Sequence, residues 1–225
     1  MEELEISIRE KSQDYYKIAE KMRVERIKNA RKLEQNIERE ISFLGMTKAR
    51  VKIDIIPRND QKDIISNIKD TGTEDVEFLI SPNPGEDLKP LRKIASGGEL
   101  SRIMLALKSI GKEKGYSKTL IFDEIDSGIG GKIADFVALK LKSLAKENQV
   151  ICITHLPQIA SYAEHHYRID KTIKNQRTYT TIKKLTLDER VEEIARLISG
   201  NRVTTTSCQN AREMLEQNAV SLHRE

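Results

Sequence analysis

The chain is poor in the residues that build aromatic cores and disulfide frameworks. It has no tryptophan, aromatic residues make up 4% of its 225 residues, and its two cysteines, Cys152 and Cys208, lie far apart. Its core must therefore be built from Ile, Leu, Val and Ala. A disulfide-stapled secreted domain is not expected, and a reducing cytosol is the better interpretation.

Long apolar runs are also missing. No stretch approaches the roughly 20 apolar residues that span a bilayer, and the first residues, MEELEISIRE, are charged, unlike a signal peptide. We therefore expect a soluble, cytoplasmic protein without a membrane partner. A net charge of +4 permits contact with nucleic acid but does not require it.

Residues 1–44 contain neither proline nor glycine, which predicts one uninterrupted helix. Apolar residues recur there at helical spacing, at Ala30, Leu33, Ile37, Ile41 and Leu44. This narrow stripe is typical of a coiled coil, so we expect residues 1–45 to form a coiled-coil arm whose partner helix lies elsewhere. A surface helix packed on its own domain is the alternative. The seven basic and two acidic residues of 17–32 form either a solvated face or a DNA contact.

The rest of the chain, 46–225, reads as one α/β domain. Strands are expected at 49–57, 76–80, 119–124, 149–155, 165–171 and 177–185, and helices at 101–112, 133–146, 187–200 and 207–217. The strands at 119–124 and 149–155 are apolar throughout and are separated by one helix. This is the pattern of parallel strands that are buried on both faces.

Polar residues follow these two strands directly. Asp123 and Glu124 end the first strand and His155 follows the second. Ligands bind outside the carboxyl ends of parallel strands. There an aspartate can hold Mg²⁺, a glutamate can polarise water, and a histidine can contact a phosphate. Each residue taken alone is equally compatible with a structural role.

Ser96, Gly97 and Gly98 precede a predicted helix and raise a related question. Free N–H groups at the positive end of a helix can bind a phosphate that glycine allows to approach. An ordinary serine N-cap is the alternative. The sequence has no phosphate loop of the form G-x-x-x-x-G-K-[ST], because GIGGK at 128–132 is followed by Ile133. The candidate magnesium and water residues are therefore present without a phosphate cradle.

Three segments in this order resemble motifs of ABC-type ATPases. SGGELSR (96–102) is similar to the signature motif, TLIFDE (119–124) to the Walker B strand, and ITH (153–155) to the switch-histidine loop. Longer stretches, such as FLISPNPGEDLKPLRKIASGGELSRIMLALK and THLPQIASYAEHHYRIDK, resemble the RecN family of bacterial SMC-like DNA repair ATPases. The resemblance covers roughly residues 20–217.

The resemblance implies the C-terminal lobe of an ABC-type ATPase head, a mostly parallel sheet flanked by helices, with a returning coiled-coil helix. It implies ATP and Mg²⁺ as cofactors, with Asp123 on the metal, Glu124 polarising water and His155 sensing the γ-phosphate. The residues that would cap ATP held by a second head are Ser96, Gly97, Gly98 and Glu99. Gly130 stands where many ABC ATPases have an aspartate.

The resemblance also implies three partners for a function in DNA double-strand break repair. These are an N-terminal half carrying Walker A, a second copy of the head, and DNA at the bacterial nucleoid. Met1 would then be a cut point, and the chain alone would neither bind ATP tightly nor hydrolyse it. Two other hypotheses stay open: an SMC-like DNA tether in which ATP is mainly a clamp, and a subunit of another ABC ATPase.

Overall fold

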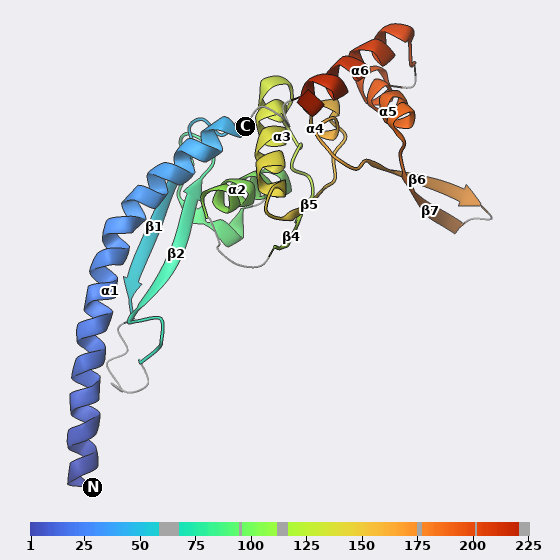
Figure 1. Cartoon of the computed structure of the whole chain (residues 1–225). Coiled ribbons are helices and arrows are strands. Elements are labelled where there is room, and N and C mark those ends of the chain that lie inside the picture. Colours follow the sequence, from blue (N-terminus) through green and yellow to red (C-terminus); the bar gives the residue numbers. More distant parts are fainter. Residues whose placement is uncertain (59–67, 95, 112–116, 175–176, 201, 221–225) are drawn as a thin grey trace. The chain divides into compact units, whose positions relative to one another are not determined.

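The computed structural model describes residues 1–58, 68–94, 96–111, 117–174, 177–200 and 202–220. The chain divides into two compact units, Met1–Ala95 and Ser96–Glu225 (Figure 1). The first unit joins the long N-terminal helix to the antiparallel strands that follow it. The domain boundary expected at residue 45 stays a prediction.

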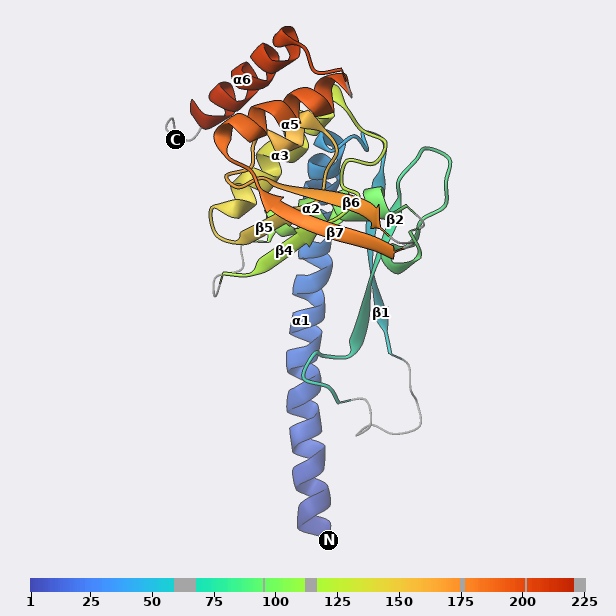
Figure 2. The same ribbon diagram turned by 90° about the vertical axis from the view of Figure 1, so that its right-hand side faces the viewer.

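The first unit consists of one long helix and a small sheet. Helix α1 (Glu2–Phe43) is uninterrupted, as predicted, and the chain turns after it through Gly45, whose φ is 92°. Strands β1 (Arg50–Pro57), β2 (Glu74–Ser81) and β3 (Lys89–Pro90) form an antiparallel sheet in that order. The β1–β2 ribbon runs back along the second half of α1 (Figure 2).

The apolar stripe of α1 packs against this sheet. Ala30, Ile37, Ile41 and Leu44 are at most 9% exposed, and the helix contacts β1, whose Val51 and Ile53 are also buried. The stripe from Ala30 to Leu44 is therefore covered within its own unit, and the expectation that residues 1–45 form a coiled-coil arm stays a prediction. The physical reason for the cover is that the following strand supplies apolar side chains at matching positions.

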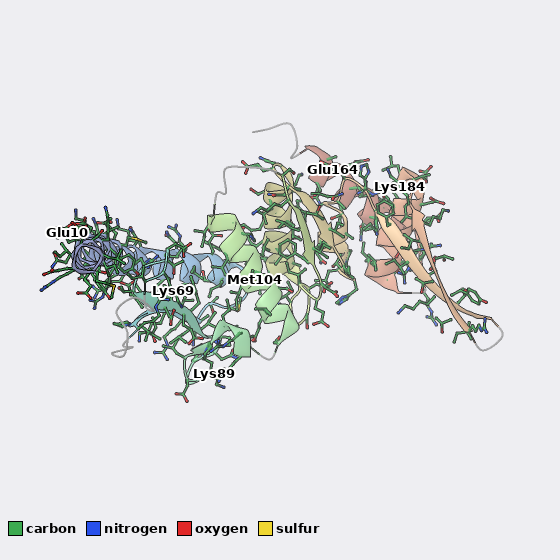
Figure 3. The ribbon with its side chains drawn as sticks, turned by 90° about the horizontal axis from the view of Figure 1, so that it is seen from below. Glu10, Lys69, Lys89, Met104, Glu164 and Lys184 are labelled. Carbon is green, nitrogen blue, oxygen red and sulfur yellow. The ribbon has the colours of Figure 1, made fainter. Side chains whose placement is uncertain are left out.

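Hydrogen bonds also join α1 to β1. The Glu38 carboxylate accepts the Val51 N–H at 2.8 Å, and the Glu34 carboxylate accepts the Ile53 N–H at 2.7 Å. In the first part of α1, Ala19 is 1% exposed, and Tyr15 and Arg26 donate hydrogen bonds to the carbonyls of Lys69 and Thr71. The side chains around Glu10 radiate from the helix axis (Figure 3). Exposed apolar residues that a partner helix could cover are found in this first part: Leu4, Ile6, Ile8, Ile18, Val24 and Ile27.

The second unit contains the predicted parallel strands. Strand β4 (Thr119–Phe122) pairs in parallel with β5 (Gln149–Cys152), whereas the other two sheets of the described residues are antiparallel. Helices α2 (Gly97–Ile110) and α3 (Gly131–Ala145) pack on each other, and α3 contacts β5. The α/β class and the parallel pairing are confirmed.

Only one face of the parallel pair is covered, which corrects the expectation of burial on both faces. Phe122 is 5% exposed on the covered face, whereas Ile121, Ile151 and Ile153 are 68%, 44% and 51% exposed on the other. The described part of this unit has no layer over those isoleucines. The strands have the apolar sequence of a sheet covered on both faces, but the described part of this unit covers one face.

The remaining elements follow β5 in chain order. They are α4 (Pro157–Ala160), the antiparallel ribbon β6 (Tyr167–Lys174) and β7 (Arg177–Lys184), α5 (Leu187–Ser199) and α6 (Thr205–Val220). A capping box begins α5: Thr186 Oγ1 accepts the Glu189 N–H at 3.4 Å, and Glu189 Oε2 accepts the Thr186 N–H at 3.0 Å. Helices α5 and α6 share an apolar core around Ile194. Within the described ranges, no helix combines the length and apolar character needed to cross a membrane.

Candidate functional site

The parallel register brings the predicted polar residues to one edge of the sheet. Phe122 is paired with Cys152, so the segments that follow β4 and β5 leave the sheet side by side. The Ile153 N–H extends the ladder by donating to the Phe122 carbonyl at 2.9 Å. Asp123 and Glu124 therefore lie near His155, as the sequence predicted.

Helix α2 begins at the serine and two glycines that the sequence singled out. Ser96 is the N-cap, and its hydroxyl accepts the Glu99 N–H at 3.4 Å. The plain capping role is therefore present. It leaves the helix N-terminus positive and able to attract an anion, so the capping and phosphate-binding interpretations are compatible.

Both glycines lie close to the segment after β4, but only Gly98 faces atoms that cannot move aside easily. A Cβ on Gly97 would lie 2.2 Å from Oε2 of Glu124. A Cβ on Gly98 would lie 2.7 Å from Cβ of Ser127 and 2.9 Å from the Glu124 carbonyl oxygen. The segment after β4 thus lies directly on the start of α2. The signature-like and Walker B-like segments are neighbours in one chain.

The turn after β4 holds its two carboxylates in a specific conformation. Asp123 Oδ1 accepts the Glu124 N–H at 2.8 Å. Glu124 has a φ of 54°, the only positive value among the non-glycine residues of the described chain. A non-glycine residue in this region costs on the order of 1–3 kcal/mol, and such strain clusters at functional sites. Both carboxylates are exposed.

Two residues of α2 that follow the glycines clamp this turn. Ser101 Oγ donates to the Asp123 carbonyl at 2.7 Å. Arg102 donates to the carbonyls of Ile125 and Ser127 at 3.3 and 2.8 Å. Arg102 is 7% exposed, and its burial lowers the pKa of the guanidinium, an effect that Glu99 opposes. The start of α2 and the turn after β4 therefore form one hydrogen-bonded body.

His155 is held by a buried carboxylate. Asp126, 5% exposed, lies with Oδ2 at 2.9 Å from His155 Nδ1, and the same oxygen accepts the His155 N–H at 2.8 Å. Thr154 Oγ1 donates to it at 2.6 Å. The imidazole itself is 74% exposed. The site thus presents a tethered histidine beside two exposed carboxylates.

The nearby cysteine does not provide a nucleophile. Burial, with the charges of Asp126 and Asp123 nearby, raises the pKa of the Cys152 thiol to about 12. Only the thiolate is an effective nucleophile. Cys152 therefore acts as an apolar residue on the covered face of the sheet.

The donor set suits Mg²⁺ held together with a phosphate better than a metal held by protein alone. No group of three or more His, Cys, Asp and Glu side chains suited to a metal ion is present among the described residues. Mg²⁺ keeps several waters and is commonly bound through one or two carboxylates plus substrate phosphates. The exposed oxygens of Asp123 fit that arrangement.

Comparison with known proteins identifies the sequence. The chain is 44% identical over 201 residues to the DNA repair protein RecN of Rickettsia felis, covering 89% of this chain and 36% of that protein. It is 42% identical over 196 residues to RecN of Bacillus subtilis, covering 84% and 34%. The chain belongs to the RecN family. RecN of Vibrio cholerae is 38% identical over 203 residues, covering 90% of the chain and 36% of that protein. No family model matches.

This RecN-family chain spans about a third of the length of these relatives. Its fold is similar to the Smc head domain with a coiled coil and joint from Pyrococcus yayanosii, with a TM-score of 0.55 and 16% identity. That match covers 89% of this chain and 35% of the other. At this identity the likeness shows the fold alone, a head with a long helix attached.

Two residues of this RecN-family site were missed from the sequence. Asp126 lies two positions after the Asp-Glu pair, and Arg102 lies just before the apolar run of the helix. Their position beside the two candidate motifs was the available signal. It was weak because the partners of Arg102 are backbone carbonyls more than 20 positions away. The roles given to the predicted site residues stay predictions.

Proposed function

We propose that this chain is the C-terminal part of an ATPase head in a bacterial protein that repairs DNA double-strand breaks. The observation that supports it best is the meeting of three segments at one edge of the β4–β5 sheet. The first segment is the start of α2, the second follows β4, and the third follows β5. The sequence contains no phosphate loop. A head of this kind would act in the bacterial cytoplasm, at the nucleoid.

Each group at this edge has a task in ATP hydrolysis. Mg²⁺ bound with ATP would neutralise charge that develops on the phosphates. Asp123 would hold that ion, Glu124 would orient and polarise the attacking water, and His155 would contact the γ-phosphate. Ser96 to Glu99 would cap ATP bound to a second copy of the head, because the N-terminus of α2 attracts anions.

The uncovered face of the parallel sheet supports an N-terminal half as partner. Ile121, Ile151 and Ile153 form an exposed apolar row on strands whose other face is buried. Exposed apolar rows of this kind mark interaction surfaces. The missing two thirds of the length of the relatives would supply the covering layer and the Walker A phosphate loop.

The test is a Glu124→Gln substitution in the head assembled from this chain and a Walker A-bearing half. Glutamine keeps the shape of the side chain but cannot accept a proton from water. We expect ATP hydrolysis to fall by roughly 100-fold or more, while ATP-dependent association of two heads, measured by light scattering, is retained.

The matched control is Glu147→Gln, an exposed glutamate just before the amino end of β5, at the opposite edge of the sheet. It is expected to hydrolyse ATP at the unsubstituted rate. Normal turnover by the Glu124→Gln head would show that Glu124 does not have the proposed role.

The alternative of a DNA tether that depends on α1 has less support. Four basic residues of 17–32 already lie within 4 Å of a carboxylate: Lys17, Arg23, Arg26 and Lys28. Arg26 also donates to the Thr71 carbonyl at 2.8 Å, so it fastens the following loop. These pairs neutralise part of the positive charge that a DNA contact would need.

A further inference from the structure

Asp126 has a buried carboxylate that contacts Thr154 and His155. One oxygen, Oδ2, accepts hydrogen bonds from Thr154 Oγ1–H and the His155 backbone N–H at 2.6 and 2.8 Å. His155 Nδ1 lies 2.9 Å from the same oxygen. A buried carboxylate is costly unless it is hydrogen-bonded. Two donors from Thr154 and the backbone already satisfy this oxygen, so the contact with the imidazole is additional.

The contact decides which ring nitrogen of His155 carries the proton. A carboxylate oxygen only accepts, so Nδ1 must be the protonated nitrogen when it lies 2.9 Å away. In the neutral imidazole Nε2 is then the acceptor, and in the protonated imidazole it is a second donor. The ring is 74% exposed, so Nε2 is directed away from the buried carboxylate and can reach a ligand.

The anchor is itself fixed on both sides. Arg102 donates to the carbonyls of Ile125 and Ser127, which flank Asp126 in the chain. Thr154 Oγ1 also accepts the Leu156 N–H at 3.0 Å, which fixes the chain after β5. Rotation of the imidazole would break a contact between two segments that are each held independently.

We infer that Asp126 is the positioning residue of His155. It holds the imidazole as the Nδ1–H tautomer with Nε2 presented at the edge of the sheet. The inference rests on the proposed function for its catalytic consequence, since an orienting group matters only where His155 contacts a phosphate. We expect a loss of activity similar to the roughly 10- to 100-fold effect of removing the outer partners of metal-ligating side chains.

The first experiment measures the tautomer in this chain without nucleotide. Long-range ¹H–¹⁵N spectra at a pH where the imidazole is neutral distinguish Nδ1–H from Nε2–H, and His155→Gln identifies the signals. We expect His155 in the Nδ1–H form, and a mixture of both forms in Asp126→Ala. Thr154→Val, which removes the hydroxyl donor but leaves the carboxylate and the ring, should keep the Nδ1–H form.

The tautomer of His155 in the unsubstituted chain tests the inference even if Asp126→Ala fails to fold. An Nε2–H form in that chain would overturn the inference, and so would an unchanged Nδ1–H form in a folded Asp126→Ala chain.

The second experiment measures ATP hydrolysis by the assembled head. Asp126→Ala should lower kcat about 10-fold or more and change the KM for ATP by less than about two-fold. It should add no further loss to His155→Gln, because the two residues act as one unit. Losses that multiply in the double variant would overturn the positioning role. A head with no ATP hydrolysis at all would contradict the proposed function, while the spectra would still judge the Asp126–His155 contact.

Discussion

Gly97 and Gly98 are adjacent, but they meet different kinds of neighbour. The space beside Gly97 is taken by the end of the Glu124 side chain, which can rotate away. The space beside Gly98 is taken by the Glu124 carbonyl and the Ser127 Cβ, which cannot move without moving the turn. The pair therefore serves the packing of its own chain in addition to any phosphate.

This difference predicts unequal costs for alanine. Gly98→Ala should lower the free energy of unfolding by about 1–3 kcal/mol, the usual cost of overpacking, and Gly97→Ala by less than about 0.5 kcal/mol. Urea denaturation of the two variants measures this. Gly130→Ala is the control, since a Cβ there meets nothing within 4 Å and its φ is −172°. A Gly97→Ala chain as destabilised as Gly98→Ala would contradict the packing argument.

Helix α1 has two parts with different environments. From Ala30 onward its apolar stripe is buried against β1, and two glutamates cap N–H groups of that strand. Before that point Ala19 is also buried, at 1% exposed, but larger apolar residues such as Ile18, 60% exposed, have little cover. The second part is thus anchored by tertiary packing, and the first part leaves most of its large apolar side chains exposed.

Removing a large apolar side chain should therefore cost more stability at a buried position of the second part than at an exposed position of the first part. Ile37→Ala, at a side chain 1% exposed, should lower the free energy of unfolding of the first unit by about 2–5 kcal/mol. Ile18→Ala in the same helix should change it by no more than about 0.5 kcal/mol. Circular dichroism during urea denaturation measures both. Equal losses at the two positions would show that the first part is also packed.

On the scale of the whole molecule, the β4–β5 sheet combines polar groups at one edge with an exposed apolar face. The chain contributes acidic and histidine groups at the edge of the β4–β5 sheet, without a phosphate loop in its sequence. The same sheet leaves Ile121 and its neighbours uncovered. Both features agree with a chain that spans about a third of its RecN relatives.

The chain alone is therefore expected to be inactive with ATP. Calorimetric titration with MgATP should detect no tight binding, and phosphate release should equal that of buffer. Adding a Walker A-bearing half should restore both, because the phosphate cradle would then be present. Phosphate release by the isolated chain that is lost in Glu124→Gln would contradict this expectation.

Local patterns determined the elements of this protein. The long helix, the strands around Phe122 and Cys152, and the Thr186 capping box follow from periodicity, apolar runs and capping residues, which act over a few positions. The convergence of Asp123, Glu124 and His155 was also predictable, since parallel strands end at the same edge of a sheet.

Contacts between distant segments were decided by the tertiary structure alone. An apolar stripe specifies that a helix face is buried but not by what, so the cover of Ile37 by β1 could not be read from α1. The sequence likewise places Asp126 and His155 at the same edge but cannot show that one buried oxygen holds the ring. Periodicity in the sequence predicts that a side chain is buried. Which residue it packs against depends on how the whole chain folds.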